Sequence, residues 1–84
     1  MWQLSYTAAA ARDLRKVGPE VAGRVLAALD AFAIAGAGDV KKLQGQNPPR
    51  WRLRVGDYRA GLALDHQAMA VQVLYVRHRR EAYR

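Results

Sequence analysis

Alternating and helix-spaced hydrophobic positions predict one strand and two helices in the first half of the chain. Residues 2–6 alternate apolar and polar side chains, as in a half-buried strand, and Thr7 is suited to cap a helix. The alanine-rich stretch 8–17 predicts that helix, which Gly18-Pro19 ends. A second helix begins near Pro19, and its apolar stripe consists of Val21, Val25, Ala28, Leu29 and Phe32.

The second half predicts three strands, at about 51–55, 58–62 and 70–76. Residues 36–50 are rich in turn-forming residues and are expected to be a connection without an element of its own. The third strand is apolar on both faces apart from Gln72, as in a strand covered on both sides. The pattern predicts an α+β fold in the order β-α-α-β-β-β. A two-helix hairpin then packs on one face of a small, mostly antiparallel sheet, and residues 1–84 form one domain.

A two-residue turn at Gly56-Asp57 fixes the pairing of the hairpin and gathers arginines on one face. The turn places Arg54 opposite Arg59, and Arg52 on the same face. Like charges that face each other across a sheet repel, so this arrangement suggests a bound anion. A simpler interpretation needs no ligand: polar and apolar residues alternate along a strand with one face in solvent, and the arginines occupy the solvent-facing positions.

The net charge of +7 lies mostly in the C-terminal part, where residues 50–84 hold eight Lys or Arg and three Asp or Glu, a net +5. Clustered positive charge favours a polyanion, either nucleic acid or an acidic protein segment. The chain has no cysteine, and its two histidines have no metal-ligand partners at suitable spacing, so neither metal nor cofactor is expected. No segment predicts secretion or membrane insertion, which favours a cytoplasmic protein.

Three segments make the chain resemble the RelE/ParE superfamily of type II toxin-antitoxin systems, in particular its RelE-like branch. They are Asp39-Val40-Lys41-Lys42-Leu43, Trp51-Arg52-Leu53-Arg54-Val55-Gly56-Asp57-Tyr58-Arg59 and His78-Arg79-Arg80-Glu81-Ala82-Tyr83-Arg84. The resemblance covers essentially the whole chain. It implies a small toxin, neutralised by a cognate antitoxin, that cleaves messenger RNA in the ribosomal A site without metal and so inhibits translation.

The same resemblance implies which residues form the site. By position, the catalytic residues are Arg52, Arg54, Arg59, His78, Arg79 and Tyr83. Contacts with RNA or the ribosome are expected from Lys41, Lys42, Arg50, Arg77 and Arg80. The better-studied ribosome-dependent members have lysines at the positions of Arg52 and Arg54.

Metal-free RNA cleavage requires a base for the ribose 2′-OH, charge stabilisation at phosphorus and an acid for the leaving oxygen. Arginine binds phosphate oxygens through two donors at once but keeps its proton at neutral pH. It therefore suits charge stabilisation at phosphorus, but neither the base nor the acid role. Tyr83 and His78 are therefore the candidates for proton transfer, and Tyr83 could instead stack on a base. His66 lies in a predicted turn, 65–68, and is interpreted as structural.

Two other functions fit the same sequence. A ParE-like toxin shares the fold, lacks the ribonuclease residues and inhibits DNA gyrase. Alternatively, the basic face only docks an acidic antitoxin or nucleic acid, without turnover. In all three cases the expected partner is an antitoxin peptide, an amphipathic segment whose acidic residues reach the arginines.

Overall fold

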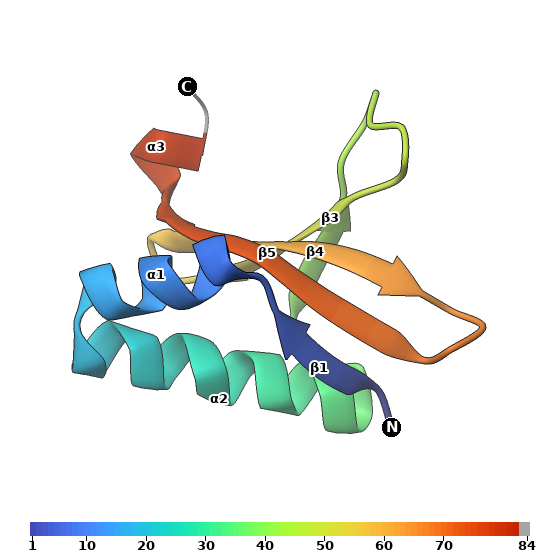
Figure 1. The fold of residues 1–84 in the computed structure, drawn as a ribbon, viewed down its shortest axis with the longest axis horizontal. Coiled ribbons are helices and arrows are strands. Elements are labelled where there is room, and N and C mark those ends of the chain that lie inside the picture. Colours follow the sequence, from blue (N-terminus) through green and yellow to red (C-terminus); the bar gives the residue numbers. More distant parts are fainter. Residues whose placement is uncertain (83–84) are drawn as a thin grey trace.

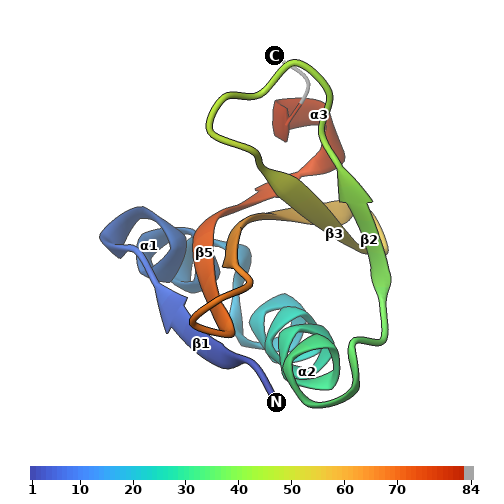
Figure 2. The ribbon, with the colours of Figure 1, turned by 90° about the vertical axis from the view of Figure 1, so that its right-hand side faces the viewer.

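Five strands form one sheet, and two helices cover one of its faces (Figure 1). The computed structural model describes the backbone of residues 1–82 and the side chains of residues 1–80. Its elements are β1 (Gln3–Tyr6), α1 (Ala8–Val17), α2 (Pro19–Ala35), β2 (Asp39–Lys42), β3 (Trp51–Val55), β4 (Tyr58–Asp65), β5 (Ala70–His78) and α3 (Arg79–Ala82). Figure 2 shows the loop between β2 and β3 together with α3 on the side of the sheet away from α2.

The sheet has the strand order β1-β5-β4-β3-β2. β1 runs parallel to β5, and the other three pairs are antiparallel. The predicted fold class is therefore confirmed. The hairpin pairing is confirmed as well, because Arg54 lies opposite Arg59 and Arg52 opposite Gly61.

The prediction that residues 36–50 contain no element was wrong, because β2 lies within them. Three of its four residues are polar and only Val40 is partly buried, so the hydrophobic pattern carries no strand signal. β2 forms because the edge of β3 offers unpaired backbone groups. The two strands pair over four residue pairs, from Asp39 with Arg54 to Lys42 with Trp51. A strand of this kind depends on its neighbour and not on its own sequence.

β5 departs from the predicted strand in length and in its surroundings. It continues to His78, and a helix layer covers only one of its faces. Its apolar residues do not alternate regularly because one extra residue interrupts the pairing: Gly61 lies opposite Tyr75, whereas Leu62 lies opposite Val73. This β-bulge explains why the strand seemed to be apolar on both faces.

Thr7 and Asp13 join α1 to the part of β5 that continues past the end of β1. The Thr7 hydroxyl accepts a hydrogen bond from the Ala10 amide at 3.0 Å, which confirms the predicted cap, and donates one to the Leu74 carbonyl at 2.9 Å. The Asp13 carboxylate accepts the Val76 amide at 3.0 Å. These two side chains bond the backbone of β5 on the edge away from β4, past the last residue that β1 pairs with.

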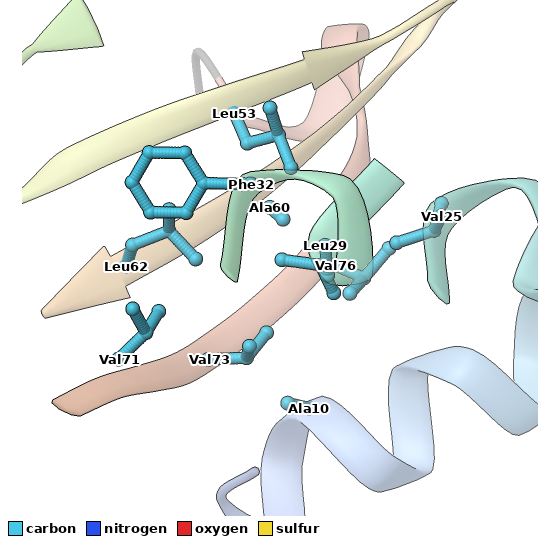
Figure 3. Close-up of a cluster of buried hydrophobic side chains, with 10 residues drawn as sticks. All are labelled: Ala10, Val25, Leu29, Phe32, Leu53, Ala60, Leu62, Val71, Val73 and Val76. Carbon is cyan, nitrogen blue, oxygen red and sulfur yellow. The ribbon is translucent and has the colours of Figure 1, made fainter. Parts of the chain in front are cut away.

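The core lies between α2 and the sheet (Figure 3). Val25, Leu29 and Phe32 confirm the predicted stripe of α2, and Leu29 is completely buried. They face the inward side chains of the three longest strands, with Ala10 contributed by α1. No helix within residues 1–82 is long and apolar enough to cross a membrane.

Leu29→Ala should lower the free energy of unfolding by about 2–5 kcal/mol, because it removes buried methyl groups and leaves a cavity. Leu26→Ala is the matched control on the same helix, since Leu26 is 37% exposed, and it should cost less than about 1 kcal/mol. Urea denaturation followed by circular dichroism measures both. Equal losses in the two variants would contradict this placement of the core.

Candidate functional site

The face of the sheet without helices carries a row of arginines across three strands. Arg54 of β3 lies opposite Arg59 of β4, which in turn lies opposite Arg77 of β5. Residues paired in this way point to the same face, and neighbouring strands are about 4.8 Å apart. Three positive side chains therefore start from adjacent positions, and we refer to Arg54, Arg59 and Arg77 as the arginine row.

A second set of side chains lies next to the arginine row on the same face. In strand order from β2 to β5 it consists of Lys41, Arg52, Gly61 and Tyr75. Arg52, Gly61 and Tyr75 each lie two residues along their strands from a member of the row, a distance of about 7 Å, and Lys41 lies opposite Arg52. The open face thus combines five basic residues, Lys41, Arg52, Arg54, Arg59 and Arg77, with the ring of Tyr75 and with Asp39, which lies opposite Arg54.

Arg59 at the centre of the row is only 6% exposed. Its Nη1 donates long hydrogen bonds to the carbonyls of Gly56 and Tyr58, at 3.4 and 3.3 Å. Among the described residues no hydrogen-bond partner reaches its Nε, and no carboxylate forms a salt bridge with it. A buried charge without a counter-ion destabilises a fold. This guanidinium is thus arranged as in a site that binds an anion.

Arg79 lies at the start of α3, against the turn that joins β3 to β4. Its amide donates a hydrogen bond to the Asp57 carbonyl at 2.7 Å, and its Nε lies 4.0 Å from the Asp57 carboxylate. Both side chains are more than half exposed, so the ion pair contributes little stability. The backbone bond fixes where α3 begins.

His78 does not join the arginine row. It lies opposite Tyr58, which points to the other face of the sheet from its neighbour Arg59, and the two rings meet edge to face with centroids 5.3 Å apart. Both line a hollow of about 470 Å³ between β5 and α1, together with Asp13 and Lys16. Alternation along β5 directs Arg77 to the open face and His78 to the helix side. Tyr83 lies outside the described residues.

The expected RNA-contacting residues are spread over three places. Lys41 and Arg77 lie on the open face. Lys42 pairs with Trp51 on the helix side of the sheet, with its Nζ 5.8 Å from the Trp51 ring. The other two flank the open face: Arg50 closes the loop between β2 and β3, and exposed Arg80 lies in α3.

Sequence reasoning missed Tyr75 and the place of Arg77 in the row. The guanidinium carbon of Arg77 lies 4.6 Å from the centre of the Tyr75 ring. Both positions depend on the bulge in β5, whose effect on the hydrophobic pattern is the same as that of a strand apolar on both faces. The one available signal was Gly61, a glycine inside a predicted strand, which often marks a bulge or a close approach.

His66 contacts two aromatic rings of the helix side, as its structural interpretation required. Its ring centroid lies 5.4 Å from that of Trp2 and 6.0 Å from that of Trp51. Among the residues whose side chains are described, no group of three histidine, cysteine or acidic side chains could hold a metal ion.

Comparison with solved structures shows the same fold in toxins of known systems. The archaeal RelE-RelB complex from Pyrococcus horikoshii superposes with a TM-score of 0.77 at 20% identity, over 93% of this chain and 94% of the other. The RelB-RelE complex from Methanococcus jannaschii gives 0.74 at 22% identity, over 93% of both chains. The RelBE2 complex from Mycobacterium tuberculosis gives 0.67 at 27% identity, over 92% and 96%.

Comparison of the sequence with protein families gives the assignment. No protein of curated function matches. The model that describes the ParE toxin of the type II toxin-antitoxin system parDE matches residues 4–83, which is nearly the whole chain. The chain therefore belongs to the ParE toxin family and is a type II toxin of the RelE/ParE superfamily.

Proposed function

We propose that this toxin cleaves messenger RNA on the ribosome, with the arginine row binding the phosphates of the RNA. Support comes above all from Arg59, a buried guanidinium between two other arginines whose Nε has no partner among the described residues. Such an arrangement costs stability unless an anion binds. The ribosome as target implies action in the cytoplasm.

The arginine row suits the charge that develops during cleavage. When the ribose 2′-oxygen attacks phosphorus, negative charge grows on the phosphoryl oxygens, and fixed donors that meet it lower the barrier. Guanidinium groups offer paired donors in one plane, which match two phosphate oxygens. Arg54 and Arg59 are directly opposite each other and are assigned this role, together with Arg79 beside the turn.

Proton transfer is assigned first to Tyr83. His78 points to the helix side, and its Nδ1 accepts a hydrogen bond from the Arg80 amide at 3.3 Å. His78 thereby supports the start of α3, and its contribution to cleavage is indirect. Tyr83 follows Arg79 by four positions in the sequence, which keeps it close to a charge-stabilising arginine along the chain.

A cognate antitoxin is the second proposed partner. The solved relatives are complexes of RelE with RelB. An acidic segment of such an antitoxin would supply a counter-ion to Arg59, whose Nε has no partner among the described residues, and would compete with RNA for the same face. Inhibition then follows from occupancy of the site.

Arg59→Met should lower the cleavage rate by about 10²-fold or more, because it removes a donor aimed at the transition-state charge. The fold should be as stable as before or more stable, since the variant also removes an unneutralised buried charge. Arg24→Met is the matched control: it removes the same charge from an exposed position of α2 and should change neither quantity. Cleavage of translated message and thermal unfolding are measured on all three proteins. An active Arg59→Met protein would overturn the role of the row.

Tyr83→Phe should reduce cleavage by about 10²- to 10⁴-fold, as expected when a proton-transfer group is lost. His78→Ala should have a smaller effect, because the ring lies on the helix side. The assay maps cuts in a message translated on programmed ribosomes, with the untranslated message as control. Full activity of Tyr83→Phe would remove this residue from the chemistry.

Inhibition of DNA gyrase is the second candidate, because the matching family model is that of ParE toxins. One induction experiment separates the two, with messages examined for codon-phased cuts and plasmids for altered supercoiling in the same cells. We expect cuts and unchanged supercoiling. Altered supercoiling with intact messages would establish the gyrase function. If the cells show neither cuts nor altered supercoiling, the remaining interpretation is a binding module without turnover.

A further inference from the structure

The guanidinium groups of the arginine row turn in two opposite directions along the sheet. The Nε of Arg54 and the Nη1 of Arg59 each donate a hydrogen bond to the Gly56 carbonyl, at 3.4 Å in both cases. A shared acceptor keeps these two cations close enough to meet one anion beside the turn. Arg77 extends away from the turn, because its guanidinium carbon lies 4.6 Å from the centre of the Tyr75 ring.

Tyr75 holds the Arg77 guanidinium in this position. One face of its ring lies on Gly61 and the other lies under the guanidinium, at a distance where cation and ring attract each other. A Cβ atom placed on Gly61 would overlap the Cε2 and Cζ atoms of the ring. Gly61 does not have a positive φ, so it is the missing side chain, and not the backbone conformation, that lets the ring lie here.

The bulge in β5 brings both Tyr75 and Arg77 to the open face. Val71 and Val73 point into the core, and in a regular strand the next odd-numbered residues would do the same. Leu74 is the extra residue, so the alternation reverses after it. Bulges that redirect side chains in this way are common next to functional sites.

The charge of Arg77 lies apart from the two charges beside the turn. Arg59 donates a hydrogen bond to the Tyr58 carbonyl at 3.3 Å, whereas the ring that carries the Arg77 guanidinium lies on Gly61. From Tyr58 to Gly61 the strand rises by about 10 Å. A single phosphate group is too small to accept hydrogen bonds at both places, but two phosphates of one nucleic-acid strand can span the distance.

The surroundings of the Arg77 guanidinium on the open face are positively charged. The charged residues in line with the Tyr75 ring across the sheet are Lys41 and Arg52. Of the described acidic side chains, Asp39 lies on the far edge strand β2, and Asp57 lies in the turn. No described carboxylate forms a salt bridge with Arg77, and the contact with the ring orders the guanidinium without neutralising it.

We propose that Arg77, held in place by Tyr75, binds a second phosphate of the RNA strand, separate from the phosphate that Arg54 and Arg59 contact during cleavage. Tyr75 is a positioning residue, because it acts through the guanidinium that lies on its ring. The proposal rests on the proposed function for its ligand class. It adds a second point of attachment, and two such points fix the direction in which the strand crosses the open face.

The test measures binding of a short, fluorescein-labelled, single-stranded 2′-deoxy oligonucleotide to the purified full chain. This probe lacks the 2′-OH that cleavage requires, and fluorescence anisotropy gives its Kd at several salt concentrations. The slope of log affinity against log salt reports the number of phosphates that the protein neutralises, at about 0.7 per phosphate for a single strand. Circular dichroism melts verify that each variant is folded.

Arg77→Met should reduce the magnitude of this slope by about 0.7, and the affinity by roughly 5-fold at about 0.1 M salt, as expected for one lost phosphate contact. Arg59→Met should reduce the slope by a similar amount. The double variant should lose the sum of the two, because the two arginines act on separate phosphates. Arg24→Met is the matched control on the exposed surface of α2 and should leave the slope unchanged.

Tyr75→Leu should weaken binding by roughly 2- to 5-fold, the contribution expected of one cation–π contact. It should have no further effect in a protein that already carries Arg77→Met, because the ring acts only through that guanidinium. Tyr75→Phe keeps the ring and should bind as the wild type does, and Gly61→Ala should resemble Tyr75→Leu because its methyl group displaces the ring. Tyr6→Leu removes a tyrosine from the helix side of the sheet and should leave the affinity unchanged.

The proposal is overturned if Arg77→Met leaves the slope unchanged, or if it reduces the slope no further in a protein that carries Arg59→Met. It is also overturned if Tyr75→Leu binds as tightly as the wild type, if it weakens binding equally with and without Arg77, or if the wild type does not bind the probe. Failure of the proposed function has a different signature. Messages would then remain uncut in induced cells although the slopes and the coupling between Tyr75 and Arg77 are found.

Discussion

The two-residue turn at Gly56-Asp57 is the constraint on which the rest of the structure depends. Gly56 adopts a positive φ of 60°, which the tight turn requires and which glycine accepts without strain. The turn sets the pairing of β3 with β4, and that pairing decides which residues face α2 and which face outward. A slip of one residue would exchange Leu53 for Arg54 in the core. The same turn also provides the Asp57 carbonyl that binds the start of α3.

Stability and function are separated on the two faces of one sheet. The helix side carries the buried leucine, valine and phenylalanine contacts that hold the fold together. The open side carries like charges, and at Arg59 a buried one, which oppose folding. Residues at functional sites often conflict with stability in this way. The helix face therefore supplies the stability that allows the arginine row to persist without a ligand.

Sequence alone predicted the elements whose signal is local. The Gly-Asp turn gave the hairpin pairing, Thr7 gave the cap, and the spacing of Val25, Leu29 and Phe32 gave the buried face of α2. The three arginines of the hairpin were placed on the correct face for the same reason. In each case the determining residues are close together in the chain.

What could not be predicted depends on partners distant in the sequence. β2 exists because β3 has a free edge, and its own residues do not favour a strand. The orientation of Tyr75, Arg77 and His78 depends on a single inserted residue in β5, and one residue of register reverses all three. Neither feature changes the hydrophobic periodicity enough to be recognised.

The hydrogen bonds from Thr7 and Asp13 to β5 have a consequence for how the molecule behaves in a crowded cell. A strand edge with free carbonyl and amide groups is a template to which another chain can add. Beyond the end of β1, the Leu74 carbonyl and the Val76 amide are already bonded to these two side chains. At the opposite side of the sheet, the short edge strand β2 presents two lysines and an aspartate. The end of β5 and the edge strand β2 thus both discourage the addition of a strand from another chain, which helps to protect a small basic protein from self-aggregation.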